Sequence, residues 1–467
     1  MRHMRWAIVA AAAYYTVFSP GLSRAAGPWT QIKNAVVCTE CAPPYNLLAV
    51  TNTPSKTTTG VVQDNIDVYA PWDTGSFRVA SCGPVVTTST CTPTTTFSTG
   101  WVPIPVNAAA GFLPSAVGWG TTPSAAHREV FVTDGNFPQG VSYATRDGAN
   151  ANAWVGPFSL GSPPGQTVLC SGPQAISQAP GMIAVFVIGC DGNLWHRFFQ
   201  NGQWSPQWIN VTAGTELDSN VLGDAGNVDF ALSVVYDNFK TGNTASTSAY
   251  RQIHVIVSDL FNETWDINYV FDASKNYNPG DPNSWEEDSN LTMNTGGETT
   301  AALSPLRKIA MFGNGAAEGS PQSLYGQSFT EQLDSFPTVP LDPTPETVNG
   351  GLIVTNPDLG FRVTPAAVTF GKPGSSCNTF PACRNGVFFL NGASQNIQYS
   401  IWEVGGSWNA SFGIKTIGGA GDTFTSNPAA VVSMQGTNAG KLTYVFAVRE
   451  VASPPDTGQV WYATVVP

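Results

Sequence analysis

The chain has 467 residues, with 20 Lys and Arg against 32 Asp and Glu and a formal net charge of −12. Only 11% of the residues are charged, against roughly 25% in an ordinary soluble domain. Phosphate recognition needs clustered Lys and Arg, and the sequence has no such cluster, so a nucleic-acid partner is excluded. With 42% hydrophobic and 11% aromatic residues, the chain can form a sizeable core, which excludes intrinsic disorder.

The first 26 residues have the three parts of a secretory signal peptide. Arg2 and Arg5 precede an apolar run over residues 6–18, and Ser23 and Ala25 are the small residues expected before a cleavage point. The apolar run is well short of the roughly 20 residues that span a bilayer. We therefore expect a secreted or extracytoplasmic protein, at the cell surface or in the periplasm, whose mature chain, residues 27–467, has no transmembrane segment.

A unit of four short runs recurs along the mature chain. The first run of each unit is rich in small apolar residues and occurs at 46–50, 115–119, 174–178, 230–235, 300–304, 365–370 and 428–433. Two alternating runs follow, often separated by Asp-Gly or Asn-Gly turns that favour hairpins, as at 129–135 with 140–146 and at 183–192 with 193–199. These three runs occur seven times.

A fourth run begins with an aromatic residue in six units, at Trp101, Trp154, Trp204, Trp285, Phe336 and Trp408. The seventh unit ends at Pro467 without one, whereas residues 28–37 start with a matching Trp29. The pattern predicts an all-β fold, a seven-bladed β-propeller in which the N-terminal strand completes the last blade, with almost no helix and a single domain over residues 27–467. Tandem β-sandwiches are the alternative, but they would not need the first strand to finish the last unit.

The leading aromatic residues are expected to fill the space between neighbouring sheets rather than to bind a ligand.

Eight cysteines fall into four close pairs: Cys38 with Cys41, Cys82 with Cys91, Cys170 with Cys190, and Cys377 with Cys383. In an exported chain such pairs form disulfides. A metal site at Cys38 and Cys41 is the alternative, but the sequence has no second CxxC and its four His are far apart. We therefore predict four disulfides, no metal and no cofactor.

Catalytic motifs are absent from the sequence, which contains no GxSxG, no HExxH and no EF-hand loop. Acidic residues gather in turns expected on one face of the propeller, including Asp134 and Asp191, although Asp is also a favoured turn residue. The prediction is a protein without a catalytic site. A glycoside hydrolase, for example one similar to sialidases, stays open as an alternative, because its carboxylate pair is a spatial feature without a sequence spacing.

The third unit carries a more specific pattern over residues 185–208. A strand, an Asp191-Gly192 turn, a Leu-Trp-His-Arg strand and a Gly-x-Trp-Ser-x-Trp segment follow one another. This segment resembles the repeat of the bacterial and fungal seven-bladed propeller lectins that bind fucose or N-acetylglucosamine-type sugars. In that family the sugar lies between adjacent blades, so the resemblance implies ligand-binding roles for Trp195, His196, Arg197, Trp204 and Trp208.

These residue types suit a sugar, since aromatic rings stack on its C–H faces and His or Arg can bind its hydroxyls. The same side chains are also the ones that the repeat needs for packing. The sequence therefore predicts a secreted carbohydrate-binding propeller whose partner is a neutral glycan or glycoconjugate. A non-enzymatic cell-surface scaffold that binds proteins is the alternative, favoured by the weaker repeat elsewhere in the chain.

Overall fold

A computed structural model gives the fold. It describes residues 29–32, 48–56, 59–73, 75–83, 91, 97, 100–109, 111–120, 122, 125–148, 153–213, 232–236, 250–258, 263–271, 280, 284–303, 308–315, 323–330, 339–340, 346–352, 364–370, 384–391, 394–403, 414–419, 421–435, 439–451 and 457–466. Over these ranges every regular element is a β-strand, and no helix has the length and hydropathy needed to cross a bilayer. The all-β prediction is confirmed.

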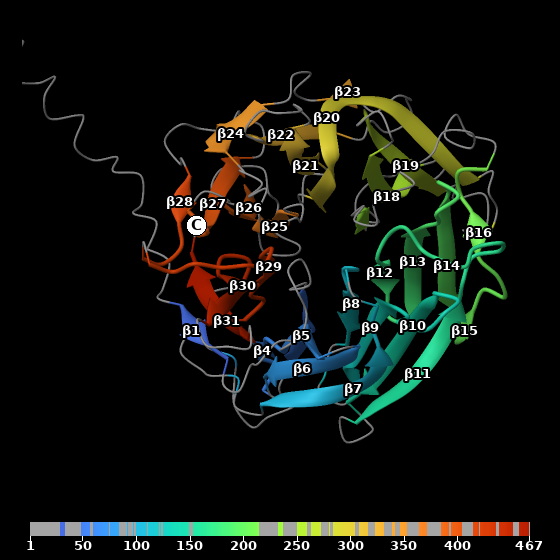
Figure 1. Cartoon of the computed structure of the whole chain (residues 1–467), viewed down its shortest axis with the longest axis horizontal. Coiled ribbons are helices and arrows are strands. Elements are labelled where there is room, and N and C mark those ends of the chain that lie inside the picture. Colours follow the sequence, from blue (N-terminus) through green and yellow to red (C-terminus); the bar gives the residue numbers. More distant parts are fainter. Residues whose placement is uncertain are drawn as a thin grey trace, which may run out of the picture.

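The strands form antiparallel sheets arranged around a central axis as a β-propeller (Figure 1). Sheet I contains β2 (Ala49–Asn52), β5 (Ile66–Asp73), β6 (Ser76–Cys82) and β7 (Trp101–Asn107), and a small hairpin of β3 (Ser55–Lys56) and β4 (Val62–Gln63) lies between its first two strands in the chain. Sheet II contains β8 (Ser115–Trp119), β9 (His127–Thr133), β10 (Val141–Asp147) and β11 (Trp154–Gly161). Sheet III contains β12 (Gln174–Ala179), β13 (Met182–Ile188), β14 (Leu194–Gln200), β15 (Gln203–Trp204) and β16 (Ile209–Asn210).

The second half of the chain forms three more sheets. Sheet IV has eight strands: β17 (Ser233–Tyr236), β18 (Tyr250–Ser258), β19 (Glu263–Phe271), β20 (Trp285–Leu303), β21 (Lys308–Gly315), β22 (Ser323–Thr330), β23 (Val339–Pro340) and β24 (Glu346–Leu352). Sheet V contains β25 (Ala366–Phe370), β26 (Arg384–Leu390), β27 (Ile397–Glu403) and β28 (Lys415–Thr416). Sheet VI contains β29 (Ala429–Val432), β30 (Thr443–Val451), β31 (Thr457–Val465) and β1 (Thr30–Gln31).

The described part of the propeller therefore has six blades, and the prediction of seven separate blades is corrected. The cause is β20, which is 19 residues long. Its first half pairs with β19 and its second half, from Thr295, pairs with β21. The strands expected for the fourth and fifth units thus belong to one continuous sheet, because no turn breaks the chain between them.

The ring is closed at the N-terminus as the sequence predicts. β1 pairs antiparallel with β31, with Thr30 opposite Tyr462 and Gln31 opposite Trp461. The indole Nε1 of Trp29 donates to the carbonyl of Ile417 at 3.0 Å. The innermost strands contact one another in the order β2, β8, β12, β17, β20, β25, β29 and back to β2, so the circuit around the axis is complete.

The core lies between neighbouring sheets, in apolar clusters that each draw on two of them. The aromatic residue that leads a fourth strand packs on the preceding sheet in every described case: Trp29 on sheet V, Trp101 on sheet VI, Trp154 on sheet I, Trp204 on sheet II and Trp285 on sheet III. A large ring at this position fills the wedge between two twisted sheets, as the sequence analysis expected.

Two predicted disulfides are present. Cys82 is bonded to Cys91, and Cys170 is bonded to Cys190, which joins the entry of β12 to the end of β13. Cys38, Cys41, Cys377 and Cys383 lie outside the described residues, as does the predicted signal peptide of residues 1–26.

Candidate functional site

The candidate site is built around β14, whose side chains alternate between two interfaces. Leu194 belongs to the apolar cluster shared with sheet IV, whereas Trp195 and Phe199 pack in the cluster shared with sheet II. His196 follows Leu194 in the alternation, and Arg197 follows Trp195. The five residues implied by the resemblance to lectins therefore do not share one surface.

His196 lies in the core between sheets III and IV. It is 0% exposed, and its ring stacks on Phe186 with centroids 4.6 Å apart. Trp285 of sheet IV approaches the same imidazole edge-on at 5.2 Å. In this position His196 packs one blade against the next and does not face a ligand at the surface.

Arg197 and Trp208 tie sheet III to the last strand of sheet II. The guanidinium of Arg197 donates to the carbonyl of Leu160 through Nη1 and to that of Ser205 at 2.9 Å through Nε. The indole of buried Trp208 donates to Leu160 at 3.1 Å as well. Arg197 as a whole is half-buried.

Trp195 and Trp204 lie at opposite ends of β14. Trp195 is opposite Val187 and donates to the Asp191 carboxylate at 3.2 Å, within the turn that leads into the strand. Trp204 is opposite Phe199, and Phe199 lies four residues after Trp195 on β14, which corresponds to roughly 13 Å of strand. The two tryptophans therefore cannot stack on one sugar ring together.

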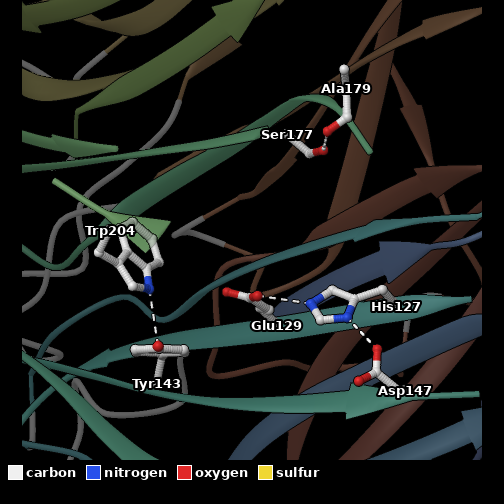
Figure 2. Close-up of polar contacts among 7 residues, drawn as sticks. All are labelled: His127, Glu129, Tyr143, Asp147, Ser177, Ala179 and Trp204. Atoms are coloured by element: carbon white, nitrogen blue, oxygen red, sulfur yellow. Dashed lines mark hydrogen bonds and ion pairs between the residues drawn. The ribbon is translucent and has the colours of Figure 1, made fainter. Parts of the chain in front are cut away.

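Trp204 belongs to an aromatic group at the rim of the interface between sheets II and III. Its Nε1 donates to the Tyr143 hydroxyl at 2.9 Å, and the two rings lie 5.6 Å apart (Figure 2). Phe158 of β11 lies 5.3 Å from Tyr143 and is 40% exposed. Burial raises the pKa of the Tyr143 phenol, which therefore stays neutral. The group forms an apolar surface that is partly open to solvent.

An acidic group that the sequence analysis missed lies next to these rings. His127 Nε2 lies 2.7 Å from Glu129 Oε1, and His127 Nδ1 is paired with Asp147. The imidazole stacks on Trp119 with centroids 4.1 Å apart. Figure 2 shows Glu129 between the imidazole and the pair of Tyr143 and Trp204. In the sequence this histidine has no acidic partner at close spacing other than Glu129, because Asp147 lies 20 residues away and meets it only across the pairing of β9 with β10.

The protonation of this group is set by burial and by the mutual contacts. Burial raises the pKa of Glu129, while its hydrogen bond to His127 opposes the shift. Burial lowers the pKa of His127, but the hydrogen bonds to Glu129 and Asp147 outweigh it, and the net pKa is raised. Glu129 is 4% exposed, and its Oε2 has no hydrogen-bond partner among the residues that the structure describes. This oxygen is unpartnered and itself buried, next to the aromatic rim.

The turn carboxylates that the sequence analysis placed on one face serve the turns themselves. Asp134 accepts from the Asn136 backbone at 2.9 Å and from the Ser142 hydroxyl at 2.7 Å. Asp191 accepts from the Asn193 backbone at 3.1 Å as well as from Trp195. At these two positions the ordinary role of Asp in turns accounts for the residue.

No protein-family model and no curated sequence matches the chain. Among solved structures, the chain is similar to the lectin of Aleuria aurantia, described as a six-bladed β-propeller with a novel fucose recognition mode, at 16% identity over 76% of this chain and 97% of the other, with a TM-score of 0.41. It is similar to AofleA from Arthrobotrys oligospora at 14% identity over 80% and 87% of the two chains, with a TM-score of 0.43. An α-L-arabinanase from Penicillium chrysogenum matches at 11% identity over 94% and 98%, with a TM-score of 0.38. At this level of likeness the matches say nothing about the ligand of this chain.

Proposed function

We propose that the mature chain, residues 27–467, is a secreted carbohydrate-binding propeller that holds a neutral sugar at the rim of the interface between sheets II and III. The observation that carries the proposal is the partly exposed group of Trp204, Tyr143 and Phe158, next to the buried and unpartnered carboxylate oxygen of Glu129. A sugar needs both features, because its C–H face stacks on rings and its hydroxyls need fixed acceptors.

Charge selects against acidic sugars at this position. Among the described residues, Glu129 and Asp147 face the same interface and both pair with His127, while the guanidinium of Arg197 donates to two backbone carbonyls. A sialic or uronic acid would bring a further negative charge toward the two carboxylates. The expected ligand is therefore a neutral glycan, which agrees with the resemblance of residues 185–208 to lectin repeats.

The residues suggested by that resemblance divide into two roles in this proposal. Trp204 lies at the rim and contacts the sugar, and Trp195 offers a separate ring near the Asp191 turn. Arg197 donates to the carbonyls of Leu160 and Ser205 and so holds sheet III against β11. His196 and Trp208 are buried and hold the sheets in position. Export is supported by the two disulfides, which form and persist in oxidising compartments.

A glycan array probed with purified residues 27–467, followed by calorimetric titration of the best ligand, tests the proposal. We expect binding of neutral glycans with a Kd in the high micromolar to millimolar range, or about −4 to −6 kcal/mol. Glu129→Gln keeps the shape of the side chain and should weaken binding by about tenfold, because an amide accepts a hydroxyl less strongly than a carboxylate. Phe137→Ala is the matched control, since Phe137 is 77% exposed and lies in the β9–β10 turn.

An array without any neutral-glycan signal would overturn the lectin proposal and favour the cell-surface scaffold.

A glycoside hydrolase is the second candidate, favoured by Glu129, a buried carboxyl with a raised pKa that shares His127 with a second carboxylate. Release of reducing ends from the bound glycans would identify hydrolysis, and its loss in Glu129→Gln would assign the acid.

A further inference from the structure

A second polar group lies on the other side of sheet II, in the interface with sheet I. Arg128 of β9 and Arg146 of β10 alternate with Glu129 and Asp147 and therefore point the opposite way. Opposite them, in sheet I, lies Asp67 of β5. Arg128 and Asp67 are both 0% exposed, and Arg146 is also buried.

The charges in this group do not balance. The single carboxylate of Asp67 is paired with Arg128 Nε and also accepts from the Ser81 hydroxyl. Within the described residues, Arg146 donates to that hydroxyl at 3.4 Å, and its guanidinium lies 5.8 Å from the centre of the Trp154 ring. Two guanidinium groups against one carboxylate leave a net positive charge in the core, which is costly without a counter-charge.

The same group has more donors than acceptors. Nη1 and Nη2 of Arg128, Nε of Arg146, the Tyr69 hydroxyl and Nε1 of Trp154 are buried, and none has a hydrogen-bond partner within the described ranges. The rings of Tyr69 and Trp154 lie 5.9 Å apart, and the charges of Arg128 and Arg146 both act on the pKa of the Tyr69 hydroxyl, so these donors lie near one another. Buried polar atoms in proteins are almost always satisfied.

One kind of ligand would compensate both the net positive charge and the excess of hydrogen-bond donors. A water molecule would accept hydrogen bonds from these groups, but it would leave the positive charge uncompensated. A small anion accepts hydrogen bonds, donates none and supplies the missing charge. We propose that the interface between sheets I and II binds a compact monovalent anion, either chloride or the carboxylate of a small organic acid, between Arg128, Arg146 and Tyr69. This site is separate from the proposed sugar site and does not depend on it.

The first test measures thermal unfolding of residues 27–467 in a buffer free of small anions. Sodium chloride, bromide, formate and gluconate are added at constant ionic strength. We expect a saturable rise in Tm of about 3 °C with the anion that fits and none with the much larger gluconate. A rise with the halides alone assigns chloride, and a larger rise with formate assigns a carboxylate. Equal Tm values in all four salts would overturn the proposal.

Two variants connect that effect to the site. Tyr69→Phe removes one donor and keeps the ring, so the half-saturating anion concentration should rise by about tenfold. Tyr444→Phe is the matched control, because Tyr444 is equally buried but belongs to the interface between sheets VI and I. An unchanged half-saturating concentration in Tyr69→Phe would contradict the assignment.

Crystals of the wild type grown in bromide give a readout that does not depend on any variant folding. The proposal predicts an anomalous bromide peak between the guanidinium groups of Arg128 and Arg146, or displacement of that peak by formate if a carboxylate is preferred. Neutral water at that position under both conditions would overturn it.

Discussion

The two faces of sheet II differ in charge although they are made from the same two strands. Toward sheet III, β9 and β10 present His127, Glu129, Tyr143 and Asp147, with two carboxylates and one imidazole. Toward sheet I they present Arg128 and Arg146, against a single carboxylate from the neighbouring sheet. One alternating stretch, His-Arg-Glu, therefore supplies an acidic interface on one side and a basic interface on the other.

The two interfaces also differ in their access to solvent. The side chain of Asp147 is 43% exposed, and Phe158 lies at an open rim. The side chains of Arg128 and Asp67 are shielded completely. The contact of Asp147 with His127 should therefore be weak and screened, whereas the contact of Asp67 with Arg128 should be strong. The account predicts that equivalent substitutions on the two faces have unequal effects.

The largest effect is expected for Asp67→Asn. Removing this carboxylate takes the paired counter-charge of Arg128 out of a buried site and should lower the free energy of unfolding by about 3 to 5 kcal/mol. Asp147→Asn on the other face is the control, with an expected loss of about 1 kcal/mol or less because the site is exposed. Urea unfolding followed by tryptophan fluorescence measures both. Equal losses of unfolding free energy in the two variants would contradict the difference between the two faces of sheet II.

The equivalent tryptophans Trp154 and Trp204 separate the functions of the two interfaces. Each leads a fourth strand and packs on the preceding sheet, so replacement by Ala should cost about 3 kcal/mol of unfolding free energy in both. Trp204→Ala should also abolish sugar binding, whereas Trp154→Ala should abolish only the dependence of Tm on small anions. If Trp154→Ala removed sugar binding in a folded protein, the separation of the two sites would be wrong.

A smaller effect is expected from pH on the side of sheet III. The pKa of His127 is raised in the folded state, so its contribution is complete below the unfolded pKa of about 6.5 and is lost as the pH rises through the folded pKa. The raised pKa of Glu129 acts in the same direction at lower pH. His127→Gln should therefore cost about 1 kcal/mol more at about pH 5.5 than at about pH 8.5. If the difference in unfolding free energy between the wild type and His127→Gln were the same at both pH values, the neighbouring carboxylates would not raise the pKa of the imidazole.

The smallest effect on stability is expected for Phe158→Ala at the rim. Because Phe158 is 40% exposed, the free energy of unfolding should change by about 1 kcal/mol or less. Its ring is part of the proposed stacking surface, so sugar affinity should fall by about threefold to tenfold. Calorimetric titration beside a urea unfolding curve checks both values, and an unchanged affinity would remove Phe158 from the site.

The strands and the closure of the ring were predictable from the sequence because they follow from local pattern. Alternating runs, turn residues and Trp29 predict the main strands of each sheet and the pairing of β1 with β31, but not the β3–β4 hairpin or β24. The number of blades was not predictable, since nothing in residues 285–303 indicates that one strand continues from one unit into the next. Whether a polar stretch such as GGETT bends or extends depends on the sheets on both sides.

The site was less predictable because proximity along the strand was treated as proximity in space. Trp195, His196 and Arg197 are adjacent in sequence, but strand alternation sends His196 to a different interface. Conversely, His127 meets Asp147 only through the register of β9 and β10. The alternation of side chains along a strand would have separated these residues. Taking every second residue of 127–133 and 141–147 places the acidic residues on one face of the sheet and the basic residues on the other.

The most direct test of the opposite faces is a crossed measurement on two conservative variants of sheets I and II. Neutral-glycan affinity and the anion-dependent rise in Tm are measured for the wild type, Glu129→Gln and Tyr69→Phe. The account predicts that Glu129→Gln loses about tenfold in glycan affinity and keeps the anion effect, while Tyr69→Phe does the reverse. If either variant changed both readouts, or if the wild type showed neither, the two faces of sheet II would not be the separate sites described.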